Sequence, residues 1–430
     1  GSHTPASPSF EFEFPVRIPC SRPVLVLLLI GLLALPSVAR AEDRADTTVT
    51  WFQERRAEGK SLTVIHPQLD LAFDLNSWLS VGAGYEADVV TGATPSIYAA
   101  PRPGQSTDTV SAASEFNDVR HSGHASLGFT GNRSTLTLGY AYGTERDYRS
   151  HAVTATGSVD LEGKNTTLSL SYTRNIDHVC DYANGDAMPL ERRALSGQNP
   201  CFTDDPAAKT VSRPVDIDTV QASITQNLTP VLVMQAGLYG QIIRGFQSNP
   251  YRRVRVYDVD AQESLPLVRD RGAAFARLNL YVAPLHASAQ LFLRGYADTW
   301  GVNGGSVEVV WNQYLGENIL FRLRGRGYQQ AGAIFFRDAT EYQTIGPAGQ
   351  YFTGDKELAP LRTVLAGGKL SYLVTAKEGH LAWGVFDEVD IHINAEALWS
   401  TPLTQTPPGG DVSGPAPDAI IAQVGVLLRY

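Results

Sequence analysis

Short stretches of alternating apolar and polar residues recur along this chain, and this pattern limits its fold most strongly. In WLSVGAGYEADVV the residues at alternate positions from Leu79 to Val89 are apolar or aromatic, and Ser80, Glu86 and Asp88 lie between them. Successive side chains of a strand point to opposite faces, so the stretch predicts a strand with one apolar and one polar face. After residue 41 no run is apolar enough to cross a membrane as a helix, which needs about 20 residues.

Sixteen segments of this kind follow one another. They span residues 46–56, 61–74, 78–90, 119–130, 134–146, 151–161, 166–176, 214–227, 231–244, 272–283, 286–300, 305–315, 318–332, 362–374, 382–400 and 418–430. An even number of such segments is typical of a bacterial transmembrane β-barrel, in which the apolar face meets lipid and the polar face meets the aqueous lumen. We therefore predict an all-β fold, an antiparallel up-and-down transmembrane barrel of about 16 strands.

The lengths of the connections favour the same fold. Connections after even-numbered segments are short, and every long connection follows an odd-numbered segment. The predicted long loops are 91–118, 177–213, 245–271, 333–361 and 401–417. Outer-membrane barrels have short periplasmic turns and longer extracellular loops, so we expect all of these loops outside the cell. A soluble sandwich or propeller gives no reason for such segregation.

The N-terminal region has the features of an export signal. Arg17 and Arg22 precede the apolar run VLVLLLIGLLAL, and Ala39-Arg40-Ala41 supplies a small-residue cleavage motif. This order is typical of a secretory signal peptide. We predict that residues 1–41 are removed and that residues 42–430 form a single barrel domain in the bacterial outer membrane. The net charge of −9 disfavours nucleic acid as a partner.

Two cysteines, Cys180 and Cys201, remain in the predicted mature chain. A cysteine pair in an exported protein usually forms a disulfide, and we predict one here. A metal-binding or redox pair is the alternative, which the long spacing and the lack of nearby His or Cys residues disfavour.

The polar faces of the predicted strands carry two groups of charges. In NILFRLRGRGYQQAG, alternation places Arg322, Arg324 and Arg326 inward, since arginine facing lipid near the midplane costs about 2–4 kcal/mol. The predicted basic wall of the lumen comprises Arg277, Arg294, Arg322, Arg324, Arg326 and Lys369. The predicted acidic wall comprises Asp70, Asp74, Glu86, Asp88, Glu388, Asp390 and Glu396, on strands that barrel closure makes neighbours.

Two interpretations of these walls remain open. The charges form a channel constriction in which the arginines favour anions. Alternatively they are cross-strand pairs that stabilise the barrel, such as Lys369 with Glu388 and Asp390. Ion selectivity after replacement of Arg322, Arg324 and Arg326 by serine distinguishes the two.

Motifs for catalysis are not found. The sequence has no G-x-S-x-G, H-E-x-x-H, P-loop or C-x-x-C motif. His121 and His124 have a metal-like spacing, but residues three apart on a strand face opposite sides. We therefore expect no enzyme activity, no catalytic residues, no metal site and no cofactor. The basic run Arg252, Arg253 and Arg255 is either a solvated loop segment or a contact for lipopolysaccharide phosphates.

The last predicted strand, AQVGVLLRY, has the apolar face Ala422, Val424, Val426, Leu428 and Tyr430. Lipid leaves no backbone group unpaired, so this strand must pair with the first one. An apolar strand with a terminal aromatic residue is the form of signal that the outer-membrane assembly machinery is expected to recognise. We expect Val426, Leu428 and Tyr430 to carry this signal, and deletion of Tyr430 to impair insertion.

Four stretches resemble an uncharacterised, porin-like outer-membrane β-barrel family of Gram-negative bacteria, a domain of unknown function. They are SLTVIHPQLDLAFDL, GYEADVVTGATPSIYAA, SEFNDVRHSGHASLGFTG and YFTGDKELAPLRTVLAGGKLSYLV. The resemblance spans about residues 48–430 and implies an outer-membrane barrel without a known activity. Family members are encoded beside thioredoxin-like proteins and small lipoproteins, which implies envelope partners concerned with redox chemistry or assembly.

We therefore predict a porin-like channel for passive diffusion of small polar or anionic solutes. The alternative is a non-channel barrel scaffold whose loops plug the lumen or dock envelope or surface partners. The expected partners are outer-membrane lipids, lipopolysaccharide and the assembly machinery. The sequence leaves the oligomeric state open, with a homo-oligomer as one outcome.

Overall fold

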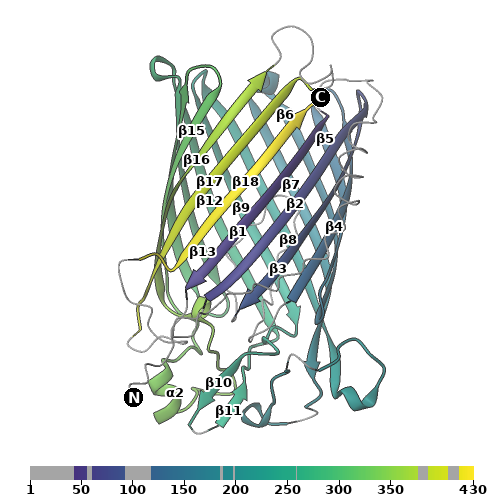
Figure 1. Ribbon diagram of the computed structural model, residues 1–430, viewed down its shortest axis with the longest axis vertical. Helices are drawn as coiled ribbons and strands as arrows, with labels where there is room; N and C mark the ends of the chain where they lie inside the picture. Colours follow the sequence, from purple (N-terminus) through teal and green to yellow (C-terminus); the bar gives the residue numbers. More distant parts are fainter. Residues whose placement is uncertain are drawn as a thin grey trace, which may run out of the picture. The chain divides into compact units, whose positions relative to one another are not determined.

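The computed structural model describes residues 43–55, 61–92, 118–184, 187–196, 199–257, 259–375, 386–404 and 416–430. In this part of the chain, sixteen antiparallel strands close into one barrel (Figure 1). Each strand pairs with its neighbours in sequence, and β1 (Arg44–Arg55) closes the barrel against β18 (Ala419–Arg429). The predicted up-and-down barrel of 16 strands is confirmed, whereas the predicted signal peptide lies outside the described residues.

All sixteen predicted segments form barrel strands. Between β1 and β18 lie β2 (Ser61–Asn76), β3 (Leu79–Gly92), β4 (Asp118–Thr130), β5 (Ser134–Thr144), β6 (Tyr148–Leu161), β7 (Thr166–Tyr182), β8 (Thr210–Thr229), β9 (Leu232–Gly245), β12 (Val268–Val282), β13 (Ala287–Asp298), β14 (Asn303–Leu315), β15 (Ile319–Gln330), β16 (Leu361–Thr375) and β17 (Glu388–Pro402).

Some strand boundaries differ from the sequence expectation. β7 and β8 pair as far as Tyr182 and Thr210, and β12 begins at Val268 rather than at residue 272. These extensions are polar and charged, so apolar alternation does not mark them, although their backbone ladder continues. β17 begins at Glu388 rather than at residue 382, and residues 382–385 lie outside the described part of the chain.

The two faces of the barrel have opposite chemistry, as alternation predicts. Large apolar side chains stand exposed on the outer face, for example Leu238 at 65%, Val153 at 58% and Val424 at 56%. No soluble barrel gains from such a surface, whereas lipid covers it without cost. Within the described residues no helix is long and apolar enough to span a membrane.

The long connections 183–209, 246–267 and 331–360 all lie at one end of the barrel, at the bottom of Figure 1. We name it the loop end, and the opposite end, with short connections such as 77–78 and 131–133, the turn end. The remaining predicted long loops, 91–118 and 401–417, lie mostly outside the described residues.

Short elements interrupt these connections. The long ones contain β10 (Arg253–Val256), β11 (Val259–Gln262), α2 (Ala339–Thr344) and the 3-10 turns Pro189–Glu191, Pro206–Ala208 and Lys356–Leu358. Two more 3-10 turns, Glu162–Lys164 and Ala283–Leu285, lie at the turn end.

The three described long connections pack into one layer, which we name the cap. β10 and β11 form a two-stranded antiparallel sheet, and Ser264 forms a β-bridge with Phe352. Phe352 is fully buried among apolar residues that include Val256 and Tyr342. Each connection therefore buries its apolar side chains against the others rather than against the barrel alone.

Part of the cap rests on inward-facing side chains. Phe246, the first residue after β9, packs on Val179, Val215, Ile217 and Ile243 at the loop ends of β7, β8 and β9. These four strand residues face the lumen, because alternation along β7, β8 and β9 places the exposed side chains of Ile176, Val220 and Ile242 on the opposite face. The cap thus extends past the rim of the barrel into the lumen at the loop end.

Candidate functional site

The structure places all six residues of the predicted basic wall on the inward face of β12, β13, β15 and β16. Their strand neighbours Leu278, Leu293, Leu323 and Leu370 are exposed on the outer face. Arg269 and Arg271 also face inward on β12, opposite Ile243 and Gln241 of β9. Sequence reasoning missed these two arginines because it placed residues 245–271 in a loop.

One arginine of the basic wall belongs to a cross-strand ion network. Arg324 lies 2.8 Å from Glu308 of β14 and 3.1 Å from Glu396 of β17. Glu396, which we predicted in the acidic wall, therefore forms an ion pair with an arginine of the basic wall. Sequence reasoning missed Glu308, which follows the same inward alternation on β14.

The other predicted partners are arranged differently. Lys369 lies directly opposite Arg322 on one side and Asn394 on the other. Arg322 donates from Nε to Asn312 at 2.7 Å. Glu388 pairs instead with Arg429 at 2.7 Å, at the turn end.

Four arginines of the basic wall have no carboxylate partner among the described residues, and Arg322, which donates to Asn312, is one of them. Arg277 lies over the ring of Phe292, 5.1 Å from its centroid, and Arg326 lies 5.9 Å from the ring centroid of Tyr328. Arg294 has no hydrogen-bond or ion-pair partner in the described part of the chain. Positive charge on this side of the lumen thus exceeds its local counter-charge.

Several carboxylates of the predicted acidic wall lie beside histidines on neighbouring strands. His66 lies 2.7 Å from Asp88 through Nδ1 and 4.0 Å from Glu86 through Nε2. His124 lies 3.2 Å from Asp70. All five residues face the lumen from β2, β3 and β4.

The acidic wall continues beyond the barrel seam. On β17, His392 lies 3.7 Å from Asp390. The backbone amide of Asp74 donates to Asp43 at the turn end.

Because histidine changes its charge between about pH 5 and pH 8, the net charge of this wall depends on pH. The inward alternation that selected the carboxylates also marks the histidines.

His121 and His124 face opposite sides of the barrel, as their spacing on a strand predicts. His121 lies 2.7 Å from the hydroxyl of Tyr85 on the outer face, whereas His124 contacts Asp70 inside. The described residues contain no group of three or more metal-ligating side chains.

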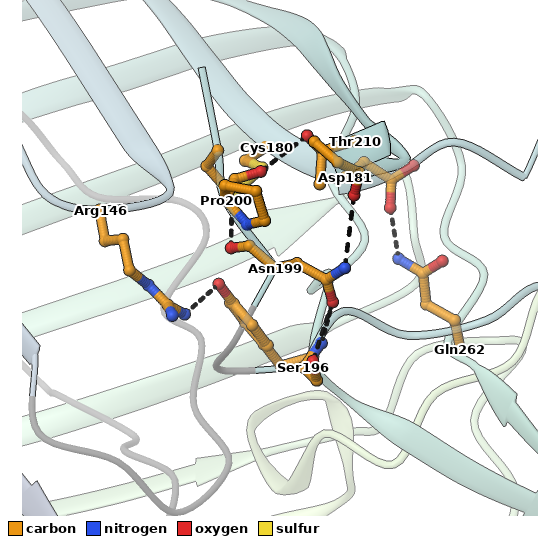
Figure 2. Close-up of a disulfide and its surroundings, with 11 residues drawn as sticks. Arg146, Cys180, Asp181, Ser196, Asn199, Pro200, Thr210 and Gln262 are labelled. Carbon is orange, nitrogen blue, oxygen red and sulfur yellow. Dashed lines mark hydrogen bonds between the residues drawn. A yellow bond between two sulfur atoms is a disulfide. The ribbon is translucent and has the colours of Figure 1, made fainter. Parts of the chain in front are cut away.

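The predicted disulfide joins Cys180 at the end of β7 to Cys201 in the cap (Figure 2). Beside it, Asp181 is fully buried and accepts from Gln262 at 2.9 Å (Figure 2). Arg192 and Arg213 each lie 3.3 Å from the same carboxylate. Two connections far apart in sequence are thereby fixed to one barrel strand.

A second buried network holds the rest of the cap. Glu263, which is fully buried, accepts from the backbone of Asn249, from Thr353 and from Arg252. Arg252 also lies 2.9 Å from Asp355. Burial raises the pKa of Glu263, although Arg252 opposes the shift. The pKa of Arg252 is raised despite its burial, because Asp355 and Glu263 favour its charge.

This network corrects the expectation of a basic surface run in the cap. Arg252 is buried between Glu263 and Asp355. Only Arg253 and Arg255 are exposed, and Arg255 lies 3.7 Å from Asp260. Three adjacent arginines therefore do not form a common anion contact.

The cap also reaches the opposite part of the rim. Lys356, in the connection between β15 and β16, pairs with the buried Glu54 of β1. Asp181 on β7 lies six strands from β1 around the shorter arc of the barrel. The contacts of Asp181 and Lys356 thus tie the cap to two distant parts of the wall.

The closing strand has the expected orientation. Val424, which faces outward, is exposed, and Val426 and Leu428 share its face. The backbone amide of Tyr430 donates to Asp43 at 3.0 Å, and its ring lies 4.9 Å from that of Phe386. The proposed assembly signal is therefore an ordered part of the barrel seam.

Comparison with known families gives an assignment. A family model described as "Protein of unknown function (DUF3570)" matches residues 31–385, more than half of the chain. The chain belongs to this family. The match ends before β17 and β18, whereas the sequence resemblance extends to residue 430. No curated protein matches the chain.

Several solved outer-membrane structures are similar in architecture. CdiB from Acinetobacter baumannii is 9% identical, with a TM-score of 0.46 over 91% of this chain and 61% of that chain. OccK2 (OpdF) from Pseudomonas aeruginosa in complex with glucuronate is 9% identical, with a TM-score of 0.35 over 90% of this chain and 97% of that chain. A bacterial polysaccharide outer membrane secretin is 10% identical, with a TM-score of 0.44 over 91% and 100%.

This chain spans less than two thirds of CdiB. At these TM-scores the likenesses do not bear on function, and the closed sheet itself establishes the barrel. The chain is an outer-membrane β-barrel of the DUF3570 family.

Proposed function

We propose that the protein is a channel for passive diffusion of small polar solutes, with a preference for anions. The observation that carries this proposal is the excess of inward arginines on one side of the lumen. On β12 to β15 the inward face holds seven arginines and only two carboxylates, Asp298 and Glu308. A wall that served stability alone would pair its charges, because like charges on neighbouring strands destabilise a sheet.

The dimensions of the barrel are compatible with this role. Barrels of about 16 strands enclose an aqueous channel unless loops fill it. Rings or rows of arginine in such a channel favour anions. In this proposal the cap narrows the extracellular mouth of the channel, and the inward side chains of the strands still line the lumen.

Release of solutes from liposomes tests the channel directly. Proteoliposomes loaded with uncharged sugars of graded size should release the smallest sugars and retain the largest. Liposomes that contain protein unfolded before reconstitution serve as the control. Retention of every sugar by the folded protein would contradict the proposal.

The cap favours a second candidate function, a barrel scaffold that does not conduct. Its buried networks around Asp181 and Glu263 join three connections and fix them to the rim. Such a layer can present a constant outer surface to other envelope components. This candidate requires that the same liposomes retain even the smallest sugar.

Membrane partners follow from the outer face and the seam. The exposed apolar face requires lipid, and strand ends at the loop end would contact lipopolysaccharide. We also propose that the assembly machinery recognises the face of β18 that holds Val426 and Leu428. We propose no catalytic role for the barrel.

A further inference from the structure

We propose that His66 and His124 make the ion selectivity of the barrel sensitive to pH, so that its preference for anions increases on acidification. This inference rests on the proposed channel function, because it names a regulation of the same lumen. Both histidines lie on the inward face of the wall, on β2 and β4, since Ile65 and Leu127 are exposed on the outer face of these strands.

Each of the two histidines contacts carboxylates of the acidic wall. His66 lies 2.7 Å from Asp88 through Nδ1 and 4.0 Å from Glu86 through Nε2. His124 lies 3.2 Å from Asp70 through Nε2. The side chains of His66 and His124 are 27% and 32% exposed, so both imidazoles exchange protons with the water of the lumen.

Gly84 allows one of these pairs to form across a whole strand. Asp70 on β2 and His124 on β4 both lie directly opposite Gly84 of β3. A Cβ atom at Gly84 would overlap the imidazole of His124 and the carboxylate of Asp70. The strand register therefore holds this histidine and this carboxylate in contact over a residue that has no side chain.

The inward residues next to the histidines on the outer two strands are uncharged in the described part of the chain. On β5 the residue opposite His124 is Ala141, and its inward neighbours are glycines. On β1 the residue opposite His66 is Thr50, and its inward neighbours are also uncharged.

Three further charged groups complete these surroundings. Asp46 on β1 lies directly opposite Asp70, and Arg120 on β4 lies directly opposite Asp88. Glu54 of β1 lies further toward the loop end, where it forms an ion pair with the cap. Aspartate, glutamate and arginine side chains ordinarily titrate outside the interval from about pH 5 to pH 8, whereas histidine titrates within it. The change of charge in this interval therefore comes from the histidines.

The two histidines face the basic wall across the lumen. In the closed strand order β3 and β13 are eight strands apart in both directions, so they lie on opposite sides of the barrel. β3 lies between the strands of the two histidines, and β13 carries Arg294 beside Arg277 of β12. A solute in the lumen therefore passes between the two walls, and the charges of both determine the field that it meets.

The direction of the pH effect follows from these charges. A neutral imidazole leaves the carboxylates beside it free to attract cations and to oppose the field of the arginines. Acidification toward about pH 5 adds one positive charge at His66 and one at His124. The negative field of the acidic wall then weakens, and the arginines of the opposite wall favour anions more strongly.

Reversal potentials of the full-length protein in planar bilayers test this regulation, in a fixed gradient of potassium chloride. From about pH 8 to about pH 5.5 the wild-type potential should shift toward anion selectivity. H66Q/H124Q gains no charge at these two positions and should lose more than about half of this shift. The buried His392 of β17, which lies beside Asp390, should account for the remainder.

A second variant fixes the positive charge instead of removing it. H66K/H124K carries both charges throughout this pH range, so its potential at about pH 8 should match that of the wild type at about pH 5.5. The glutamine variant should behave at the lower pH as the wild type does at the higher one. A variant that only misfolds would not give both results.

Histidines of the outer face provide a matched control. His121 and His151 lie 2.7 Å from the hydroxyls of Tyr85 and Tyr140 on the lipid-facing side of the wall. H121Q/H151Q removes the same number of imidazoles without changing the lumen. It should keep the full wild-type shift.

The outcomes separate this regulation from the channel itself. Equal selectivity of the wild type at both pH values would overturn the regulation and leave the channel intact. A full shift in H66Q/H124Q would also overturn it, because the titrating groups would then lie elsewhere. Absence of conductance at either pH would overturn the channel, and the regulation with it.

Discussion

Arginines on a single strand of this barrel differ in role because their neighbours differ. Arg324 is held between Glu308 and Glu396 on two other strands. Arg322, two residues away on the same face, contacts the neutral Asn312 and lies opposite Lys369. Arg324 therefore stabilises the wall, and Arg322 contributes positive charge to the lumen.

This difference predicts unequal effects of the two substitutions on the free energy of unfolding. R324Q removes two ion pairs and leaves two carboxylates without their partner, so it should lower the free energy of unfolding by about 1–3 kcal/mol. R322Q removes a charge beside Lys369 and should change stability by less than about 1 kcal/mol. Thermal unfolding in detergent, followed by circular dichroism, checks both. Equal losses in the two variants would contradict these roles.

At the scale of elements, the cap depends on contacts between connections rather than on regular structure. Within its described residues, regular structure is limited to the short strands β10 and β11, the helix α2 and three 3-10 turns. The disulfide Cys180–Cys201 and the network around Glu263 supply its remaining constraints. Loss of either should therefore loosen the cap while the barrel persists.

The disulfide should limit local opening of the connection 183–209. The bond closes a segment with a sequence separation of 21. Closure of a loop of this size stabilises by about 3 kcal/mol. In C180S/C201S, trypsin should cleave the folded protein at Arg192 and Arg193 faster than in the wild type. The variant should not respond to added reductant, whereas the wild type should. Equal resistance to trypsin in both proteins would contradict a role of the disulfide in holding this connection.

Glu263 predicts a pH dependence of stability. Because burial raises its pKa, the folded protein keeps this proton to a higher pH than the unfolded chain does. Above the ordinary value of about 4.3 the free energy of unfolding then falls as pH rises through the raised value. The wild type should lose more thermal stability than E263Q between about pH 4 and pH 7. Parallel losses in both proteins would contradict this account of Glu263.

The barrel strands could be predicted from sequence, and the cap could not. Period-two alternation determines strand position, face and register in lipid, because a shift by one residue would turn Arg322, Arg324 and Arg326 toward the membrane. The contact of Asp181 with Gln262 joins residues 81 apart in sequence, and no local pattern marks it.

The functional side chains were only partly predictable, because alternation along a strand shows which face a residue occupies but not which partner it contacts. Alternation placed Arg277 and Arg294 inward. Register and side-chain conformation decided that Arg324, and not Arg326, meets both Glu308 and Glu396. Arg271 was missed because it lies on the part of β12 that continues beyond the apolar alternation.

At the scale of the whole molecule, the barrel combines a lumen whose two walls differ in charge with a cap at its loop end. Arginines without carboxylate partners lie on β12, β13 and β15, and carboxylate–histidine pairs lie on β2, β3, β4 and β17. If the lumen conducts, the arginines without carboxylate partners should set its preference for anions.

Ion selectivity in planar bilayers tests this central claim most directly. In a gradient of potassium chloride, the wild type should give a reversal potential on the anion-selective side. R277Q/R322Q, which removes two inward charges from the basic wall, should shift the potential toward cation selectivity. R253Q/R255Q, which removes two charges from the cap, should leave it nearly unchanged. A wild-type channel without anion preference, or equal potentials in both variants, would contradict the account.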